Sequence, residues 1–178
     1  PKKIQIQFAW MEAHPDVTLS GHEISILPEF EHAEDCFSRE RYEDFDIDSL
    51  VPSKFSKVSL LLRGNFSTSS VMVKREIPNR FTSGKFYGED RLLLLEIACY
   101  GGLIYKLPLQ LECKFKETYG AGGLSANVWL MEKGELDAFR RIWKAGDISL
   151  AVYFLVCALS LAKYLRRYAL ARLRIHAL

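Results

Sequence analysis

Residues 148–162 form a run of fifteen residues without charge, and this run constrains the fold more than any other feature. An ordinary surface helix shows a polar stripe, whereas Ser149 and Ser160 are the only small polar residues here. Two interpretations stay open: a helix buried in this domain or in an oligomer, and a membrane span. A bilayer crossing needs about 20 apolar residues, whereas a run of about 10 to 14 apolar residues more often marks a buried helix. The length of this run lies between the two and does not distinguish them.

Large apolar side chains within and just after this run are the expected oligomer or membrane contacts. They are Leu150, Phe154, Leu155, Leu159, Leu161 and Leu165. Leu165 belongs to the set because the long stem of Lys163 can lie along an apolar surface while its ammonium group stays in water.

The segment that follows, 163–178, is basic and has a helical period. Its cations are Lys163, Arg166, Arg167, Arg172 and Arg174. A basic amphipathic helix can lie on anionic lipid, contact nucleic acid or dock on an acidic protein. The alternative is a solvated helix end whose cations complement the helix macrodipole.

An acidic segment balances this tail. Residues 29–48 hold nine carboxylates against two arginines, a net charge of −7, so the rest of a chain of net charge +2 carries +9. The acidic patch expected to take part in contacts is Glu31, Glu34, Asp35, Glu43, Asp44 and Asp46. If this patch of one copy meets the basic tail of the next, the contact is heterologous and builds rings or arrays.

Alternation of apolar and polar residues predicts that much of residues 1–131 forms β-strands. The expected strands lie at 4–10, 24–26, 58–62, 71–73, 92–100, 103–115 and 127–131. The strands at 92–100 and 103–115 are expected to form a hairpin, because Gly101 and Gly102 tolerate the positive φ values of tight turns. Pro108 cannot donate to a ladder, so its strand is expected to be an edge strand or to carry a bulge.

After residue 131 the apolar period becomes helical. A short amphipathic helix is expected over 134–145, and Gly146 is expected to end it. Asp147 is the expected N-cap of a second helix that runs from Ile148 toward the C-terminal end.

The sequence therefore predicts an α+β fold. A mainly antiparallel β domain over 1–131, in the form of a sandwich, small barrel or meander, precedes a helical segment over 132–178 for assembly or membrane association. Because no βαβ alternation occurs in the sequence, a doubly wound nucleotide-binding fold is disfavoured.

Residues that could carry chemistry do not form a coherent motif. Glu31, His32, Asp35 and Cys36 are metal-ligating types that lie close together, but their spacing matches no closed zinc pattern. Neither a nucleophile elbow nor a phosphate-binding glycine loop occurs. We expect no metal, no cofactor and no catalytic residue, with a ligand or enzyme site near His22 and His32 as an alternative.

The cysteines bear on the compartment. Cys36, Cys99, Cys113 and Cys157 are spread singly, unlike the cysteines of a disulfide-rich secreted domain. We expect thiols in a reducing compartment, on the cytoplasmic face, in a soluble or membrane-associated chain. The first residues show no apolar segment of a signal peptide.

These features predict a non-enzymatic structural protein that joins a homo-oligomer or a larger complex through its apolar C-terminal helix. A virion coat or matrix protein and an accessory subunit of a membrane complex both fit. The expected partners are copies of the chain or other subunits. Further candidates are a membrane and, on the basic tail, nucleic acid. A small-molecule ligand is not expected. A nucleic-acid-binding module using basic strands and the tail is the second alternative function.

Overall fold

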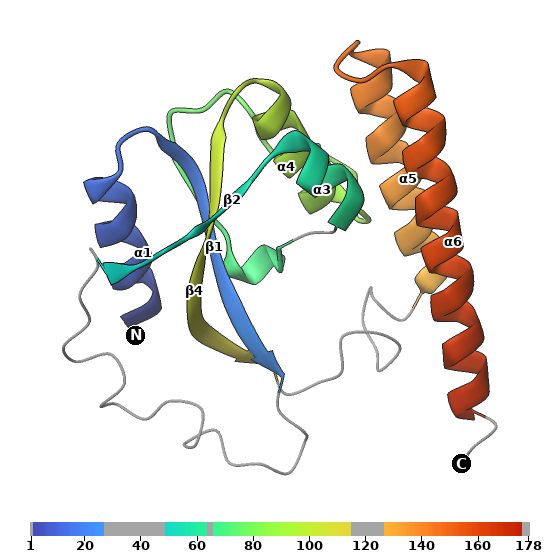
Figure 1. The fold of residues 1–178 in the computed structure, drawn as a ribbon, viewed down its shortest axis with the longest axis horizontal. Helices are drawn as coiled ribbons and strands as arrows, with labels where there is room; N and C mark the ends of the chain where they lie inside the picture. The colour runs from blue at the N-terminus through green and yellow to red at the C-terminus, as the bar shows by residue number, and fades with distance from the viewer. Residues whose placement is uncertain (1, 27–48, 64–65, 115–126, 176–178) are drawn as a thin grey trace.

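The computed structural model describes residues 2–26, 49–63, 66–114 and 127–175. The fold is of the α+β class, as the sequence predicts, with a mixed sheet in the N-terminal part and two long helices at the C-terminal end (Figure 1). In chain order the elements are α1 (Lys2–Ala13), β1 (Val17–Ile26), β2 (Ser53–Phe55), α3 (Lys57–Arg63), the 3-10 turn η3 (Thr68–Ser70), β3 (Met72–Val73), α4 (Glu89–Cys99), β4 (Leu103–Lys114), α5 (Val128–Lys144) and α6 (Leu150–Ile175).

The sheet has the strand order β2-β4-β1-β3. Its two long central strands, β1 and β4, run parallel from the pair Val17–Leu103 to the pair Ile26–Lys114. The short strand β2 pairs antiparallel with β4, and β3 pairs antiparallel with β1. Parallel neighbours need a long connection, and the chain supplies one because α3 and α4 lie between β1 and β4 in the sequence.

Pro108 lies at an irregularity in β4. His22 of β1 pairs with Leu107, whereas the next residue, Glu23, pairs with Gln110, so Pro108 and Leu109 have no partner in β1. A proline is tolerated at such a bulge because it has no N–H group to donate. The expected bulge is confirmed, although β4 has a neighbour on both sides and is not an edge strand.

Helix α1 replaces the strand expected at residues 4–10. Its buried residues, Ile6, Gln7, Trp10 and Met11, are spaced by one helical turn. The prediction was wrong because Ile6 and Trp10 lie four residues apart, and this spacing places them on one side of a helix as well as of a strand.

Helix α4 replaces the strand expected at residues 92–100, so the expected hairpin does not form. Residues 92–95 and Ile97 are all buried, and an apolar run covered on all sides shows no period by which helix and strand could be distinguished. The two glycines end the helix instead. Gly101 has a φ of 81°, and the N–H of Gly102 donates to the carbonyl of Ile97 at 2.9 Å, as in a Schellman motif.

Two more expected strands are helical. Residues 58–62 lie within α3, and residues 127–131 begin α5, where Asn127 Oδ1 accepts a hydrogen bond from the Leu130 N–H at 3.0 Å. Asparagine is among the best N-cap residues, and this capping role outweighs the strand-like pattern that follows it. The strands expected at 24–26, 71–73 and 103–115 are confirmed as parts of β1, β3 and β4 within the described residues.

Both expected C-terminal helices form, with different boundaries. Gly146, at a φ of 85°, ends α5 as predicted, but α5 already begins at Val128. The N-cap of α6 is Ser149 and not Asp147, because Ser149 Oγ accepts from the Val152 N–H at 3.3 Å. The N–H of Asp147 instead donates to the Ile142 carbonyl at 3.1 Å and so completes the end of α5.

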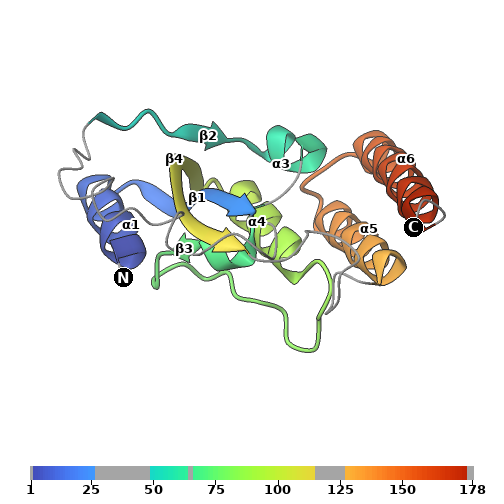
Figure 2. The same ribbon diagram turned by 90° about the horizontal axis from the view of Figure 1, so that it is seen from below.

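One apolar core joins the sheet to the C-terminal helices. It contains Leu19 of β1 and Ile104 of β4, the buried leucines of α3 and α4, Phe139 of α5 and Val156 of α6. Helix α4 lies between the sheet and α5 (Figure 2). The expected division of the chain at residue 131 falls inside α5 and stays a prediction.

The contact between the start of α4 and α5 is very close. A Cβ atom built on Gly134 would lie 2.4 Å from the Tyr87 carbonyl oxygen and 2.5 Å from its carbonyl carbon. Both are backbone atoms, so no side-chain movement can relieve the contact. A glycine inside a helix ordinarily costs about 1 kcal/mol relative to alanine, and here it allows the two backbones to approach.

We expect Gly134→Ala to lower the free energy of unfolding by about 1–3 kcal/mol, the cost of overpacking, although the same change in an open helix is stabilising. Denaturant unfolding measures the difference. Gly84→Ala is the control, because a Cβ at Gly84 meets nothing within 4 Å and only its positive φ opposes the change. Equal or greater stability of Gly134→Ala would contradict the close approach.

Candidate functional site

Helix α6 has two faces of different character. Its inner face packs on the rest of the molecule through Val156 and Ser160, which are both buried. Tyr153 stacks on Trp143 of α5 with ring centroids 5.0 Å apart, and Tyr164 lies against Trp129 at 5.5 Å. These contacts bind one side of α6 firmly to α5.

The opposite side of α6, which we call the outer face, is apolar and exposed. It consists of Ala151, Phe154, Leu155, Ala158, Leu161, Ala162, Leu165 and Tyr168. Phe154 is 62% and Leu165 is 63% exposed, and Leu150 and Leu159 at the margins of this face are exposed as well. The spacing of three and four residues forms a continuous stripe along the helix.

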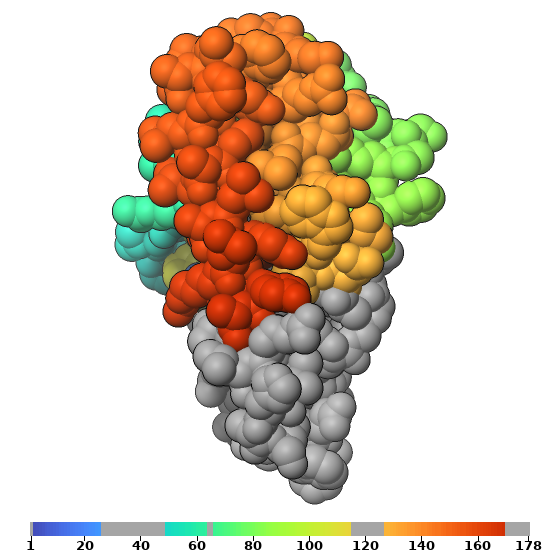
Figure 3. All heavy atoms as spheres, turned by 90° about the vertical axis from the view of Figure 1, so that its right-hand side faces the viewer, coloured from blue at the N-terminus to red at the C-terminus, as the bar shows by residue number. Residues whose placement is uncertain are grey.

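Figure 3 shows α6 and α5 side by side on one face of the molecule. The exposed residues of α5 include the cations Lys133, Arg140 and Lys144, so the apolar stripe of α6 borders a polar helix. Monomeric proteins seldom expose contiguous apolar patches of more than a few hundred Å². This stripe is therefore the candidate functional site of the described residues.

A buried ion pair fixes the orientation of α6 about its own axis. Arg167 Nη2 of α6 lies 2.9 Å from Glu132 Oε2 of α5, and the Glu132 side chain is completely buried. Burial raises the pKa of the Glu132 carboxyl and the charge of Glu135 raises it further, while the charge and the hydrogen bond of Arg167 lower it. The pair turns Arg167 inward and directs the apolar stripe away from α5.

Lys163 provides a second attachment, because its Nζ donates to the backbone carbonyl of Leu62 at the end of α3. Two of the cations that the sequence assigns to a basic tail therefore bind within the molecule. Arg166 is exposed. Arg172 and Arg174 lie within α6, but their side chains are outside what the structure describes.

The structure brings the six predicted contact residues together on α6, where all are exposed. The acidic patch and His32 fall outside the described residues. Sequence reasoning missed the small members of the outer face, Ala151, Ala158 and Ala162, and the role of Glu132. The seven-residue spacing of Ala151, Ala158 and Leu165 is a signal that could have identified the stripe.

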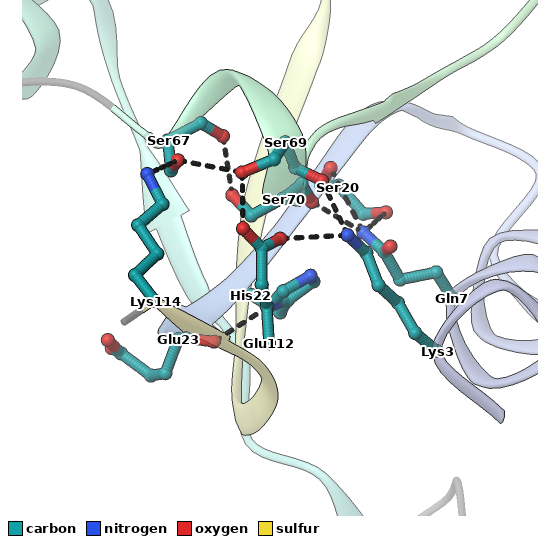
Figure 4. Close-up of polar contacts among 10 residues, drawn as sticks. All are labelled: Lys3, Gln7, Ser20, His22, Glu23, Ser67, Ser69, Ser70, Glu112 and Lys114. Carbon is teal, nitrogen blue, oxygen red and sulfur yellow. Dashed lines mark hydrogen bonds and ion pairs between the residues drawn. The ribbon is translucent and has the colours of Figure 1, made fainter. Parts of the chain in front are cut away.

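His22, the second candidate centre, belongs to a polar cluster that ties α1 and η3 to the sheet (Figure 4). Glu112 of β4 accepts from Lys3 Nζ at 2.9 Å and from Ser69 Oγ at 2.5 Å. Gln7 Nε2 of α1 donates to the Ser70 carbonyl at 2.9 Å. Because these groups satisfy one another, we interpret the cluster as structural.

His22 itself is 1% exposed. Its Nδ1 lies 2.7 Å from the Glu23 carbonyl oxygen, which can only accept, so Nδ1 carries the proton of the neutral ring. Nε2 is buried without a hydrogen-bond partner among the described residues. Burial lowers the pKa of His22 and the charge of Lys3 lowers it further, whereas the bond to the Glu23 carbonyl and the carboxylates of Glu112 and Glu23 oppose the shift.

Among the described residues, no group of three or more His, Cys, Asp or Glu side chains could hold a metal ion.

The cysteines differ in their oxidation state. Cys99 and Cys157 are free thiols, but Cys113 is disulfide-bonded. The expectation of four thiols is therefore wrong at Cys113, because spacing along the chain does not reveal which sulfurs meet in space.

Within the same described ranges, no helix combines the length and the apolar content that a membrane crossing requires.

Comparisons with protein-family models, with curated proteins and with solved structures give no significant match for this chain. The functional argument therefore rests on the geometry of α6 and its surroundings.

We expect Arg167→Met to lower the free energy of unfolding by about 3 kcal/mol, because it leaves the buried Glu132 carboxylate without its cation. The double variant Glu132→Gln with Arg167→Met should lose less, because no buried charge remains. Chemical denaturation at pH 7 measures the free energy of unfolding of the single and the double variant. The control is Arg166→Met, an exposed cation on the same helix, for which a change within about 0.5 kcal/mol is expected. A double variant less stable than Arg167→Met would refute this role of the pair.

His22 should make the fold sensitive to acid. Its folded pKa lies below the ordinary value of about 6.5, so the unfolded chain takes up a proton first as the pH falls. Stability contributed by the neutral ring is present above about pH 6.5 and is lost progressively below it. Denaturant midpoints of the parent and of His22→Gln, measured from pH 7.5 to pH 5, should show a shallower decline for the variant. Parallel pH profiles would rule out this contribution.

Proposed function

We propose that the protein is a non-enzymatic structural protein that self-associates through the outer face of α6. The observation that carries the proposal is the apolar stripe from Ala151 to Tyr168, which is exposed although the opposite side of the same helix is packed. Transferring such side chains out of water is favourable by about 1.5–3 kcal/mol for each fully buried large residue. A second copy of the chain supplies a surface of the same chemistry.

The distribution of charge supports a protein partner. Nucleic acid and anionic lipid are recognised by rows of cations, but the stripe from Ala151 to Ala162 has none. Arg167 is paired with Glu132, and Lys163 donates to the Leu62 carbonyl. The other cations of α6, Arg166, Arg172 and Arg174, all follow Ala162 in the sequence.

The margins of the stripe also suit a protein contact. Interfaces between subunits combine an apolar centre with a polar rim, and α5, which lies beside α6 (Figure 3), exposes Lys133, Arg140 and Lys144. Tyr168 and Trp129, which both lie against Tyr164, add exposed aromatic side chains of the kind that is enriched at interface cores.

Self-association should weaken strongly when the stripe becomes polar. We expect Phe154→Gln to raise the dissociation constant at least about tenfold, equivalent to ~1.4 kcal/mol, because two copies of the side chain leave the interface. Sedimentation velocity over a series of concentrations measures this. Phe8→Gln is the matched control: Phe8 of α1 is also exposed, at 57%, but it lies outside the outer face, so its dissociation constant should equal that of the parent.

Two results would refute the proposal. One is a parent chain that stays monomeric at all concentrations. The other is an equal loss of association in both variants. Flotation with vesicles of phosphatidylcholine and phosphatidylserine separates the lipid alternative: a monomer that floats, and that loses this property in Phe154→Gln, would assign the outer face to a membrane surface instead.

A further inference from the structure

We infer that the second copy binds antiparallel, with the two α6 helices crossing near Ala158 in a closed two-fold dimer. This inference rests on the proposed function and specifies the partner's orientation. It follows from two independent properties of the outer face: the order of large and small side chains along the stripe, and the position of charge on the helix.

The order of side-chain sizes fits an antiparallel pair. When Ala158 of each copy lies at the crossing, Ala151 faces Leu165 of the other copy and Phe154 faces Ala162. In these two pairs a large side chain meets a small one, so the helices can interdigitate there at normal packing density. Leu155 and Leu161 face each other and fill the layer between these pairs and the crossing.

The in-register parallel arrangement lacks this complementarity. Phe154 would face Phe154 and Leu165 would face Leu165, whereas Ala151 would face Ala151 and Ala162 would face Ala162; Ala158 faces its own copy in both arrangements. Layers of two large residues would alternate with layers of two methyl groups, so the interface would hold both steric conflicts and voids.

Charge favours the same orientation. Helix α6 has no acidic residue between 150 and 175, and all its cations follow Ala162. Glu132 neutralises Arg167, which leaves the charges of Lys163, Arg166, Arg172 and Arg174. A parallel pair would bring both sets of cations together. An antiparallel pair separates them and brings Arg166 near the first turn of the other helix, where Asp147 precedes the N-cap.

The inner face of α6 makes this orientation available. The Arg167–Glu132 pair and the Trp143–Tyr153 stack hold the helix to α5 on the side away from the stripe, so the dimer can form without disturbing these contacts. Because a two-fold contact uses the same surface on both copies, it closes at two chains. An apolar contact of this kind also persists in salt, unlike contacts between the acidic segment and the basic tail.

Cysteine cross-linking distinguishes the orientations. The experiment uses the full chain with Cys157→Ser, which removes the free thiol next to the crossing. Cys99 is retained, because burial, with the nearby charge of Asp147, raises its pKa to about 11 and keeps it protonated at neutral pH. Ala151→Cys and Leu165→Cys are introduced separately, and each sample is treated with a short bismaleimide alone and as a one-to-one mixture.

In the mixture the mixed dimers, which random pairing makes half of the dimers, should shift to the mass of a cross-linked dimer, whereas each variant alone should stay largely uncross-linked. In the antiparallel pair the two copies of residue 151 are about 21 Å apart along the helix axis, from fourteen residues at 1.5 Å each. The background chain without an added cysteine is the control for other thiols.

Each other outcome overturns the inference in a different way. Efficient cross-linking of Ala151→Cys alone, with none beyond it in the mixture, would show a parallel pair and leave the proposed function intact. A chain that sediments as a dimer without cross-linking in any sample would place the contact elsewhere. A chain that sediments as a monomer would refute the proposed function itself.

Discussion

The burial of helix α4 is the contact on which the rest of the structure depends. Its run of leucines from Leu92 to Leu95 packs toward the sheet, α3 and α5 at once, so the helix offers almost no side to water. A run of this kind can be satisfied only at the centre of a fold. The sheet on one side and the pair of C-terminal helices on the other are layers around it, and Leu19, Phe139 and Val156 belong to the same core.

This arrangement explains why α6 is left with an apolar side. Helix α5 has enough polar residues on its outward side to face water, and it covers only one side of α6. The contact with α3 covers a second region, where Lys163 donates to the Leu62 carbonyl. No further element among the described residues lies over the outer face, so the uncharged run of the sequence is divided between an intramolecular contact and an exposed stripe.

The sequence predicted the class of the fold and its C-terminal helices, because their helical period is carried by strongly amphipathic or uncharged segments. It failed at α1, α3, α4 and the start of α5. In α4 complete burial removed the period, and in α1 the four-residue spacing of Ile6 and Trp10 suited both structures. Asn127 as an N-cap fixes the start of α5, and Gly101 as a terminator fixes the end of α4. The strand prediction overlooked both signals because it relied on the apolar pattern alone.

The candidate site shows the same division. The large residues of the outer face were predicted from the absence of charge alone. An uncharged run indicates apolar contacts whether these lie within the chain or with another molecule. Which of the two sides faces outward depends on Glu132, a residue distant in the sequence from Arg167. An ion pair with one completely buried partner is costly to break, so it selects one rotation of α6 among those that would bury a similar apolar area. The polar pair thereby determines which apolar residues are exposed. Because alanines alternate with Phe154 and Leu165 along that exposed side, the stripe has a relief of large and small side chains that a partner surface must match.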